Sequence, residues 1–504
     1  DWGLDNIGFF VQDSWSVNYN LTMTYGFRVD IPNVSRKPTY NQAASETFGF
    51  RNDATIDGNE LVQPRFGFNY TFDSERPTQL RGGMGLFQGA AATVWLSNPY
   101  SNTGLQYTDY FFSRGISNFS PNPNDQLAQF TPGTGATQSV DFIDPDLGQP
   151  AVWKANLAFD HELPWYGIVA SAEVILTSVE EGIYYQQLNL GAPTAVGQDG
   201  RYIYWNANGL DPSRWNQFGS GTSVGSRANS NRAYNDAIIA RSTSKGDGQQ
   251  LTLSLQKPYE ENWFWQVAYT YTDANEVSPL TSSTSSSQLG NVAIFNSNEE
   301  ISARSNYLVK DRFSGAVSYR HFFFDDLKTE FSLVYEGRRG KPYSYTFDND
   351  ANGDGRFNDL LYIPSGPGDV LFGSPEEEAA FFAYVQGNEY LRSHMGEVAE
   401  RNADYSSWVH NFDVRISQEL PGFFAGNKAE IWLDILNIGN MIDKDWGVIE
   451  EIGFPLMRGI VEYGGIDAAS GRYVYRFNTP DSQRVYDDRG ISRWALQLGF
   501  RYSF

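Results

Sequence analysis

Apolar and polar residues alternate along many segments of the chain, and the C-terminal segment is the clearest case. Its apolar side chains share one parity: Trp494, Leu496, Leu498, Phe500, Tyr502 and Phe504. Small or polar residues lie between them. Successive side chains of a β-strand point to opposite faces, so a period of two predicts strands with one apolar and one polar face. Because the pattern recurs along most of the chain, it predicts an all-β fold.

About thirteen segments show this alternation, near residues 7–16, 20–31, 64–73, 78–88, 151–161, 167–178, 249–257, 263–273, 311–322, 328–338, 410–420, 429–438 and 492–504. Turns of a few residues alternate with long connections near 32–61, 90–150, 190–247, 273–308, 348–408 and 439–490. A half-solvated soluble sheet also alternates. Short turns on one side and long loops on the other are typical of outer-membrane barrels, whose strands need about 9–11 residues. The layout predicts an antiparallel transmembrane β-barrel with long extracellular loops.

The residues at the strand ends and on the polar faces agree with this prediction. Tryptophans lie near the ends of the apolar faces, where membrane barrels place their aromatic girdles: Trp15, Trp153, Trp165, Trp263, Trp265 and Trp494. The polar faces carry charges of both signs, as a wide, water-filled lumen requires: Arg28, Asp30, Arg65, Arg81, Lys154, Glu173, Arg312, Glu330, Asp413, Arg415, Glu430, Asp434 and Arg501. For each of these charges, a structural ion pair in the wall is a simpler role than ligand binding.

The composition narrows the class of protein. The 504 residues include 40% hydrophobic and 15% aromatic residues, no cysteine, and a formal net charge of −23. No apolar run reaches the length of about 18 residues that a membrane helix needs, which excludes a helical membrane protein. The absence of cysteine excludes a disulfide framework and thiolate metal sites. The acidic balance argues against nucleic acid as a partner.

The direction of the strands predicts that the chain is part of a longer protein. With the long loops outside, the first and last of thirteen strands both run towards the periplasm. An even-stranded barrel with both termini in the periplasm then requires an odd number of further strands upstream. The chain also opens at Asp1 inside a predicted strand, with no initiator methionine or signal peptide.

Several segments carry a family resemblance. They are FVQDSW at 10–15, LTMTYGFR at 21–28, DNDANGDGRFNDLLYIP at 348–364, Arg401-Asn402, NFD at 411–413, PGFF at 421–424, LDILN at 433–437 and the terminal Phe504. Together they resemble TonB-dependent outer-membrane receptors, and more narrowly their Oar-like branch.

The resemblance implies a 22-stranded barrel in the outer membrane of a Gram-negative bacterium, of which this chain supplies the last thirteen strands. It implies a plug domain, absent from this chain, and energy coupling to the TonB complex through the missing N-terminal part. Its further partners are outer-membrane lipid and lipopolysaccharide, and the barrel-assembly machinery through Phe504. The implied function is transport of a bulky solute of unknown identity across the outer membrane. A passive porin-like channel or a surface adhesin is the alternative.

The strongest candidate for a ligand-binding motif is the acidic segment 348–359, which matches the pattern of a twelve-residue calcium-binding loop. Oxygen ligands would come from the side chains of Asp348, Asp350, Asn352 and Asp359 and from the main-chain carbonyl of Asp354, with Gly353 as the turn glycine. Hard oxygen ligands at alternate positions are what Ca²⁺ requires. Arg356 at the ninth position and the strand-like flanks depart from an EF-hand. The alternative is an Asx- and Gly-rich turn that needs no ion.

The connection 348–408 is predicted to fold. A helix is predicted to begin at Pro375, with Ser374 as its capping residue. The run of three glutamates that follows is favourable at the positive end of the helix dipole. The connection carries twelve acidic residues against three arginines. This favours a solvated acidic face, with binding of divalent cations or a basic ligand as the alternative.

Enzyme signals are weak, and we expect no catalytic residues. The segment 221–225 fits the G-x-S-x-G pattern but lies in a Gly- and Ser-rich loop, without the strand-to-helix turn that makes its serine, Ser223, nucleophilic. The four histidines, His161, His321, His394 and His410, show no metal-ligand spacing. An outer-membrane hydrolase would need a Ser/His pair that the pattern does not supply.

Overall fold

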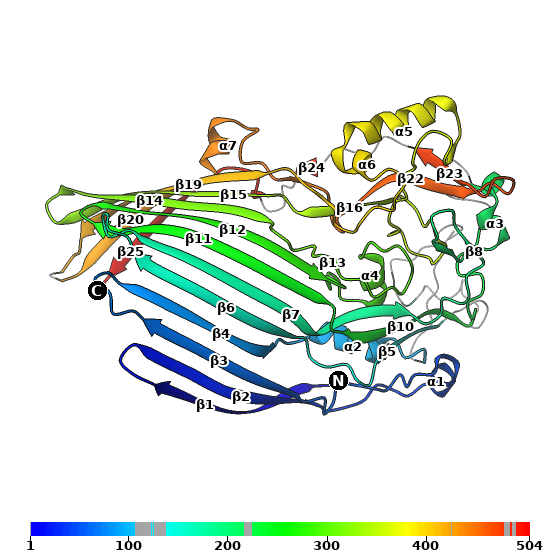
Figure 1. Ribbon diagram of the computed structural model, residues 1–504, viewed down its shortest axis with the longest axis horizontal. Helices are drawn as coiled ribbons and strands as arrows, with labels where there is room; N and C mark the ends of the chain where they lie inside the picture. The colour runs from blue at the N-terminus through cyan, green and yellow to red at the C-terminus, as the bar shows by residue number, and fades with distance from the viewer. Residues whose placement is uncertain are drawn as a thin grey trace.

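The computed structural model describes residues 2–105, 122, 124, 138–215, 224–424, 426–477, 484–485 and 490–504. Its main element is an antiparallel sheet, here called the wall, whose thirteen strands pair in chain order (Figure 1). They are β1 (Leu4–Ser16), β2 (Leu21–Val34), β3 (Leu61–Thr71), β4 (Thr78–Gln88), β6 (Ala151–Glu162), β7 (Val169–Gln187), β11 (Gly246–Glu260), β12 (Trp263–Glu276), β14 (Asp311–Phe324), β15 (Leu327–Arg338), β19 (Val409–Pro421), β20 (Lys428–Leu436) and β25 (Ala495–Ser503). All thirteen predicted strands are present.

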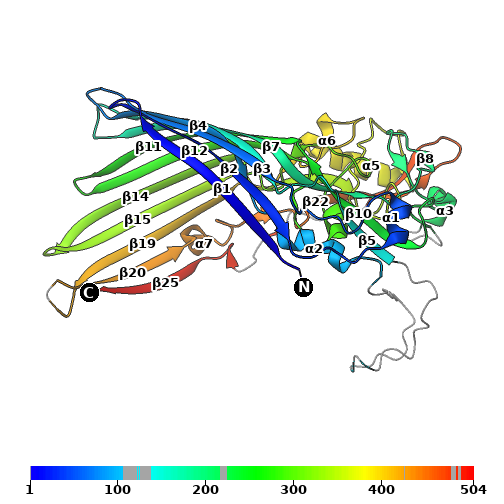
Figure 2. The ribbon, with the colours of Figure 1, turned by 90° about the horizontal axis from the view of Figure 1, so that it is seen from below.

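The two ends of the wall differ, as the sequence predicts. The short turns all lie at one end, and the long connections all emerge at the other (Figures 1 and 2). The wall is curved, and β1 and β25 are its two edge strands (Figure 2). Alternating short and long connections follow from antiparallel pairing, because each strand returns the chain to the end where the previous one began.

The apolar face of the wall is exposed. In β25, the side chains of Leu496, Leu498 and Phe500 are 55%, 72% and 62% exposed. The same holds for Leu251 and Leu253 of β11. A contiguous apolar surface of this extent is not stable in water, so the face needs an apolar environment. Within the described ranges, no helix is long and apolar enough to cross a membrane.

Shorter elements extend the wall at the end with the long connections. β10 (Tyr234–Thr243) pairs antiparallel with β7, β5 (Gln138–Ile143) pairs parallel with β10, and β13 (Ala303–Arg304) pairs with β12. The helices are also in the long connections: α1 (Gln42–Phe48), α2 (Thr93–Ser101), α3 (Ala207–Leu210), the 3₁₀ helix η2 (Pro212–Arg214), α4 (Ser285–Gly290), α5 (Pro375–Gly387), α6 (Glu389–Ser393) and α7 (Ile438–Ile442).

The long connections fold together into one unit, here called the loop cap: the described residues of 35–60, 89–150, 188–245, 277–310, 339–408 and 437–494. Its centre is a second sheet with the order β17 (Leu371–Phe372), β23 (Tyr473–Phe477), β22 (Met457–Ile466), β16 (Pro342–Phe347) and β18 (Asp404–Tyr405). Two small pairs complete the cap, β8 (Ala195–Val196) with β9 (Tyr202–Ile203) and β21 (Glu450–Glu451) with β24 (Arg484–Val485). Two connections far apart in sequence thus share one sheet, which the sequence did not predict.

The hydrophobic cluster around the second sheet of the loop cap is rich in aromatic side chains. α5 covers the second sheet with Phe381 and Val385, which are fully buried. The Phe381 ring lies 5.6 Å from that of Phe477 and 6.4 Å from that of Tyr475, edge to face in both cases. α5 begins at Pro375, as the sequence indicates, and the Ser374 hydroxyl accepts a hydrogen bond from the Glu377 amide. Burial of each large side chain stabilises such a core by about 1.5–3 kcal/mol.

Candidate functional site: the acidic turn in the loop cap

The acidic turn, residues 348–359, lies inside the loop cap rather than at a loop tip. The side chains of Asn352 and Asp359 are fully buried, and Asp350 is 3% exposed. Asp348, the first predicted ligand, is exposed. The turn leaves β16 and returns to it, because the Phe347 amide donates a hydrogen bond to the Asp359 carbonyl. The structure thus brings four of the five predicted ligands into one buried turn.

The buried carboxylates bind the backbone of their own turn. The amides of Gly353 and Gly355 donate to the two oxygens of Asp350, at 2.5 and 2.7 Å. The amide of Ala351 donates to Asp359 at 2.8 Å. The Asp354 carboxylate accepts a hydrogen bond from the amide of Arg356, two residues further on. It accepts another from the hydroxyl of Ser297, which lies in a different connection. Gly353, the predicted turn glycine, has φ of 80°, a conformation that favours glycine.

Arg201 neutralises part of this buried charge from a third connection. Its Nη1 lies 2.9 Å from an oxygen of Asp359, and its Nε lies 3.3 Å from Asp199. Its Nη2 also donates to the Leu360 carbonyl. All three charged side chains are fully buried. The sequence analysis missed Arg201, because its partner Asp359 is 158 residues away and no local pattern marks it.

Among the buried carboxyl groups of the turn, Arg201 pairs with Asp359 alone. Burial raises the pKa of Asp350 well above its ordinary value, and the carboxylates of Asp354 and Asp359 raise it further. Among the residues that the structure describes, no group of three or more acidic or histidine side chains is arranged to hold a metal ion. Ca²⁺ binding would therefore require carboxylates to leave the backbone amides that they now accept from, and it stays a prediction.

Several acidic residues of 348–408 do not form the solvated face that the sequence favours. Asp350, Asp354 and Asp359 are buried in the turn. Asp404 accepts from the hydroxyls of Tyr343 and Tyr345, at 3.0 and 2.7 Å. The prediction was wrong here because these carboxylates find donors in the folded cap, which the linear sequence does not show.

Arg401-Asn402, one of the segments that carry the family resemblance, joins the loop cap to the top of the wall. The Arg401 guanidinium donates to the carbonyls of Glu276 and Val277 at the end of β12 and to Ile301. A cavity of about 400 Å³ lies beside it. Its lining includes two arginines and two glutamates: Arg304, Arg401, Glu299 and Glu400.

On the polar face of the wall, charged side chains form ion pairs across neighbouring strands. The pairs are Arg28–Asp30 within β2 at 2.6 Å, and Arg81–Asp160 at 3.5 Å, Arg312–Glu336 at 2.7 Å, Arg320–Glu330 at 2.9 Å, Arg415–Asp434 at 2.5 Å and Arg501–Glu430 at 3.8 Å between strands. Nine of the thirteen charges named from the sequence take part in these pairs, which agrees with the structural role favoured for them. Both signs along one face keep the interior polar while the charges largely compensate each other.

No catalytic arrangement is visible in the described part of the chain. The four histidines contact different partners: Thr78 for His161, Tyr319 for His321, Tyr390 for His394 and Tyr335 for His410. Ser223, the serine of the G-x-S-x-G pattern, lies outside the described residues.

Comparison with known protein families shows which family the wall belongs to. Residues 2–443 match the family model described as outer membrane beta barrel domain. The chain belongs to this family. The apolar face of this outer-membrane barrel therefore faces lipid, and its polar face lines the interior. The aromatic residues at the strand ends, such as Trp15 and Trp494, lie at the levels where such barrels meet the membrane surfaces.

No curated protein matches the chain. Solved structures similar to it include the outer membrane transporter YddB from Escherichia coli, at 11% identity and a TM-score of 0.47. Others are the FrpB iron transporter from Neisseria meningitidis, at 9% and 0.42, and a variant of the ferric enterobactin receptor PfeA from Pseudomonas aeruginosa, at 12% and 0.44. Each alignment covers 99% of this chain and 45% of the other. Such distant likenesses say nothing about substrate.

Proposed function

We propose that this outer-membrane barrel forms the C-terminal part of a TonB-dependent transporter of the Oar-like branch, which takes up or translocates a bulky solute. The observation that carries the proposal is the loop cap. The long connections of the wall gather at one end and bury three hydrophobic clusters there, so the described mouth of the wall is covered by a folded structure. An open diffusion channel has no need of such a cover.

The resemblance to the Oar-like branch supports the same proposal, because two of its segments lie in the loop cap. The segment 348–364 is the acidic turn and the residues after it, which form isolated bridges such as that of Tyr362 with Val398. Arg401-Asn402 clamps the cap to β12. These contacts give the family segments a physical role, which is to hold the cap over the barrel mouth where a solute would first bind.

The proposal predicts a closed resting state for the protein as its gene encodes it. Reconstituted in planar bilayers in KCl, it should pass no steady current, since a transporter opens only when energised through TonB. Site-specific photo-crosslinking in cells should also join it to TonB. A steady current of porin size without TonB contact would show a passive channel, and neither current nor crosslink would point to the surface adhesin.

We also propose that the acidic turn binds Ca²⁺ as a structural ion. The sequence pattern supports this, together with the excess of carboxylates over arginines in the buried turn. A divalent cation would compensate this charge, and it would fix the turn on which β16 depends. The role proposed is stiffening of the loop cap.

Calorimetric titration of the full protein with CaCl₂ tests this second proposal. We expect saturable heat that is lost in Asp348→Ala, because Asp348 is exposed and its replacement should leave the fold intact. The control is Asp326→Ala in the β14–β15 turn, which should bind like the unmodified protein. Calcium has no role if no saturable heat is observed, or if Asp348→Ala leaves the heat unchanged.

A further inference from the structure

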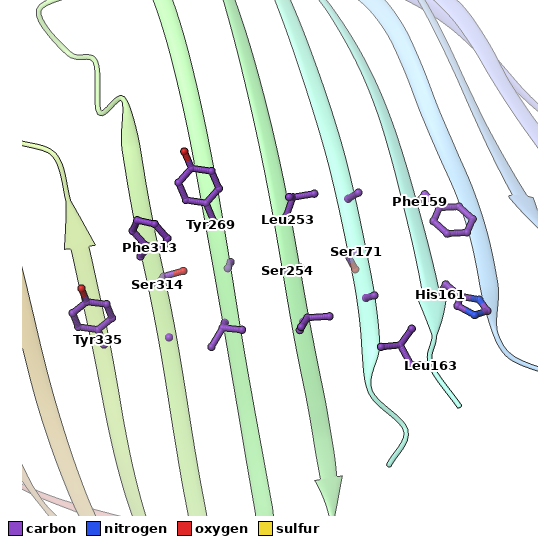
Figure 3. Close-up of a pocket in the computed structure, with 16 residues that line it drawn as sticks. Phe159, His161, Leu163, Ser171, Leu253, Ser254, Tyr269, Phe313, Ser314 and Tyr335 are labelled. Atoms are coloured by element: carbon purple, nitrogen blue, oxygen red, sulfur yellow. The ribbon is translucent and has the colours of Figure 1, made fainter. Parts of the chain in front are cut away.

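The lipid-facing side of the wall carries an apolar groove of about 700 Å³. Figure 3 shows side chains that line it, on β6, β7, β11, β12, β14 and β15. Its volume falls within the range of about 300–1,000 Å³ that is typical of small-molecule sites.

The strand register explains how the groove forms. One row of paired residues has large side chains, which make the wall of the groove: Phe159, Leu253, Tyr269 and Phe313, with Ala172 among them. The next row towards the short turns includes two small residues, Ala170 and Gly315. The groove thus follows this second row, from His161 on β6 to Tyr335 on β15. The row crosses six strands, a path of about 24 Å at about 4.8 Å between neighbouring strands.

The row of paired residues lies near the membrane surface at His161 and deeper in the bilayer at Tyr335. At one end, His161 is the residue before the last one of β6, directly beside the short turn. That turn carries Trp165 and Tyr166, which are 61% and 75% exposed, and exposed aromatic residues mark the headgroup level. At the other end, Tyr335 lies eight residues beyond Leu327, where β15 leaves its own short turn. The groove therefore leads from the headgroups towards the middle of the bilayer.

Polar groups lie at the headgroup end of the groove. Nη1 of Arg76 donates to the carbonyl of Leu163, which lines the groove, at 3.3 Å. The same guanidinium is 40% exposed and lies 3.7 Å from Glu162, which leaves it accessible to a further anion. His161 shares a hydrogen bond with the Thr78 hydroxyl at 2.8 Å. A cation at the surface end and apolar walls beyond it match an anionic headgroup with an acyl chain.

We propose that this groove is a binding site for a glycerophospholipid of the leaflet at the short-turn end. One acyl chain lies along the row from Leu163 to Tyr335, and the lipid phosphate lies at Arg76. The site rests on the family membership of the barrel and on the groove itself, and it is independent of the transport proposal.

Lipid retention by the full chain, purified from outer membranes, tests the site. Native mass spectrometry after mild delipidation should show a phospholipid retained by the unmodified protein. Ala170→Phe and Gly315→Phe should lose it, because each enlarges a small residue of the row along which the groove runs. A Cβ at Gly315 meets its nearest atom at 3.7 Å, which is an ordinary van der Waals contact, so the backbone there accepts a side chain. Arg76→Gln should lower the retention of anionic phosphatidylglycerol.

Val414→Phe is the matched control, because it enlarges a residue on the same face of β19, outside the groove. Heat-modifiable mobility on gels confirms that each variant is a folded barrel. Loss in both groove variants and retention in Val414→Phe support the site. The proposal is overturned if all variants retain lipid equally, if the unmodified protein retains none, or if the retained molecule is lipid A.

Discussion

Replacing Arg201 with methionine is expected to unfold the loop cap while the wall stays intact. The substitution leaves the carboxylates of Asp199 and Asp359 buried without their cation. Removing one partner of a buried ion pair costs about 3–5 kcal/mol, because the remaining charge is desolvated and uncompensated. Hydrogen exchange should show lost protection in β16, β22 and β23 and unchanged protection in β1 and β2.

Arg214→Met provides the control for this experiment. Arg214 lies in the same connection and faces Asp211 at 3.8 Å, but both side chains are nearly half exposed. An exposed pair of this kind contributes at most about 1 kcal/mol. Protection in the cap should therefore be retained. If Arg201→Met also leaves the cap protected, the buried network does not hold the three connections together.

Gly353→Val is expected to disrupt the acidic turn from within. Gly353 has φ of 80°. In this left-handed conformation, a residue with a side chain is destabilised by about 1–2 kcal/mol. A Cβ would also lie 2.5 Å from the Trp205 backbone nitrogen and 2.8 Å from the indole ring. Trp205 donates from Nε1 to the Ala351 carbonyl, so moving the turn away from Trp205 would break this hydrogen bond. The turn and the Trp205 core should lose hydrogen-exchange protection together.

Gly366→Val is the matched control, since it lies in the same connection. A Cβ there meets no atom within 4 Å, and its φ is not positive. The control should keep the protection of the cap. Tryptophan fluorescence gives a second measurement, because Trp205 and Trp215 lie in the same core, with their rings 5.2 Å apart. Unchanged protection and fluorescence in Gly353→Val would contradict the steric argument.

The two predictions share a consequence for function. Arg201 comes from the connection 188–245, Gly353 from 339–408, and the second sheet adds 437–494. A solute that displaces any one of these connections must therefore disturb a shared core. We expect the loop cap to respond to binding as a unit rather than loop by loop.

The sequence by itself determined the wall. Its thirteen strands, their order and the side on which the long connections emerge all follow from a period of two and from the lengths of the connections. This information is local, because each strand needs only its own apolar face to be placed. The sequence also predicted the turn glycine Gly353 and the N-terminal capping residue of α5, Ser374. Each depends only on residues a few positions away.

Only the tertiary structure decided what the long connections do. The parallel pairing of β16 with β22, the burial of Asp350 and the ion pair of Arg201 with Asp359 all join residues from different connections or distant turns. The groove at Ala170 and Gly315 depends on the register of six strands. Such features arise from contacts across long stretches of chain, and a linear pattern carries no information about which distant side chains will meet.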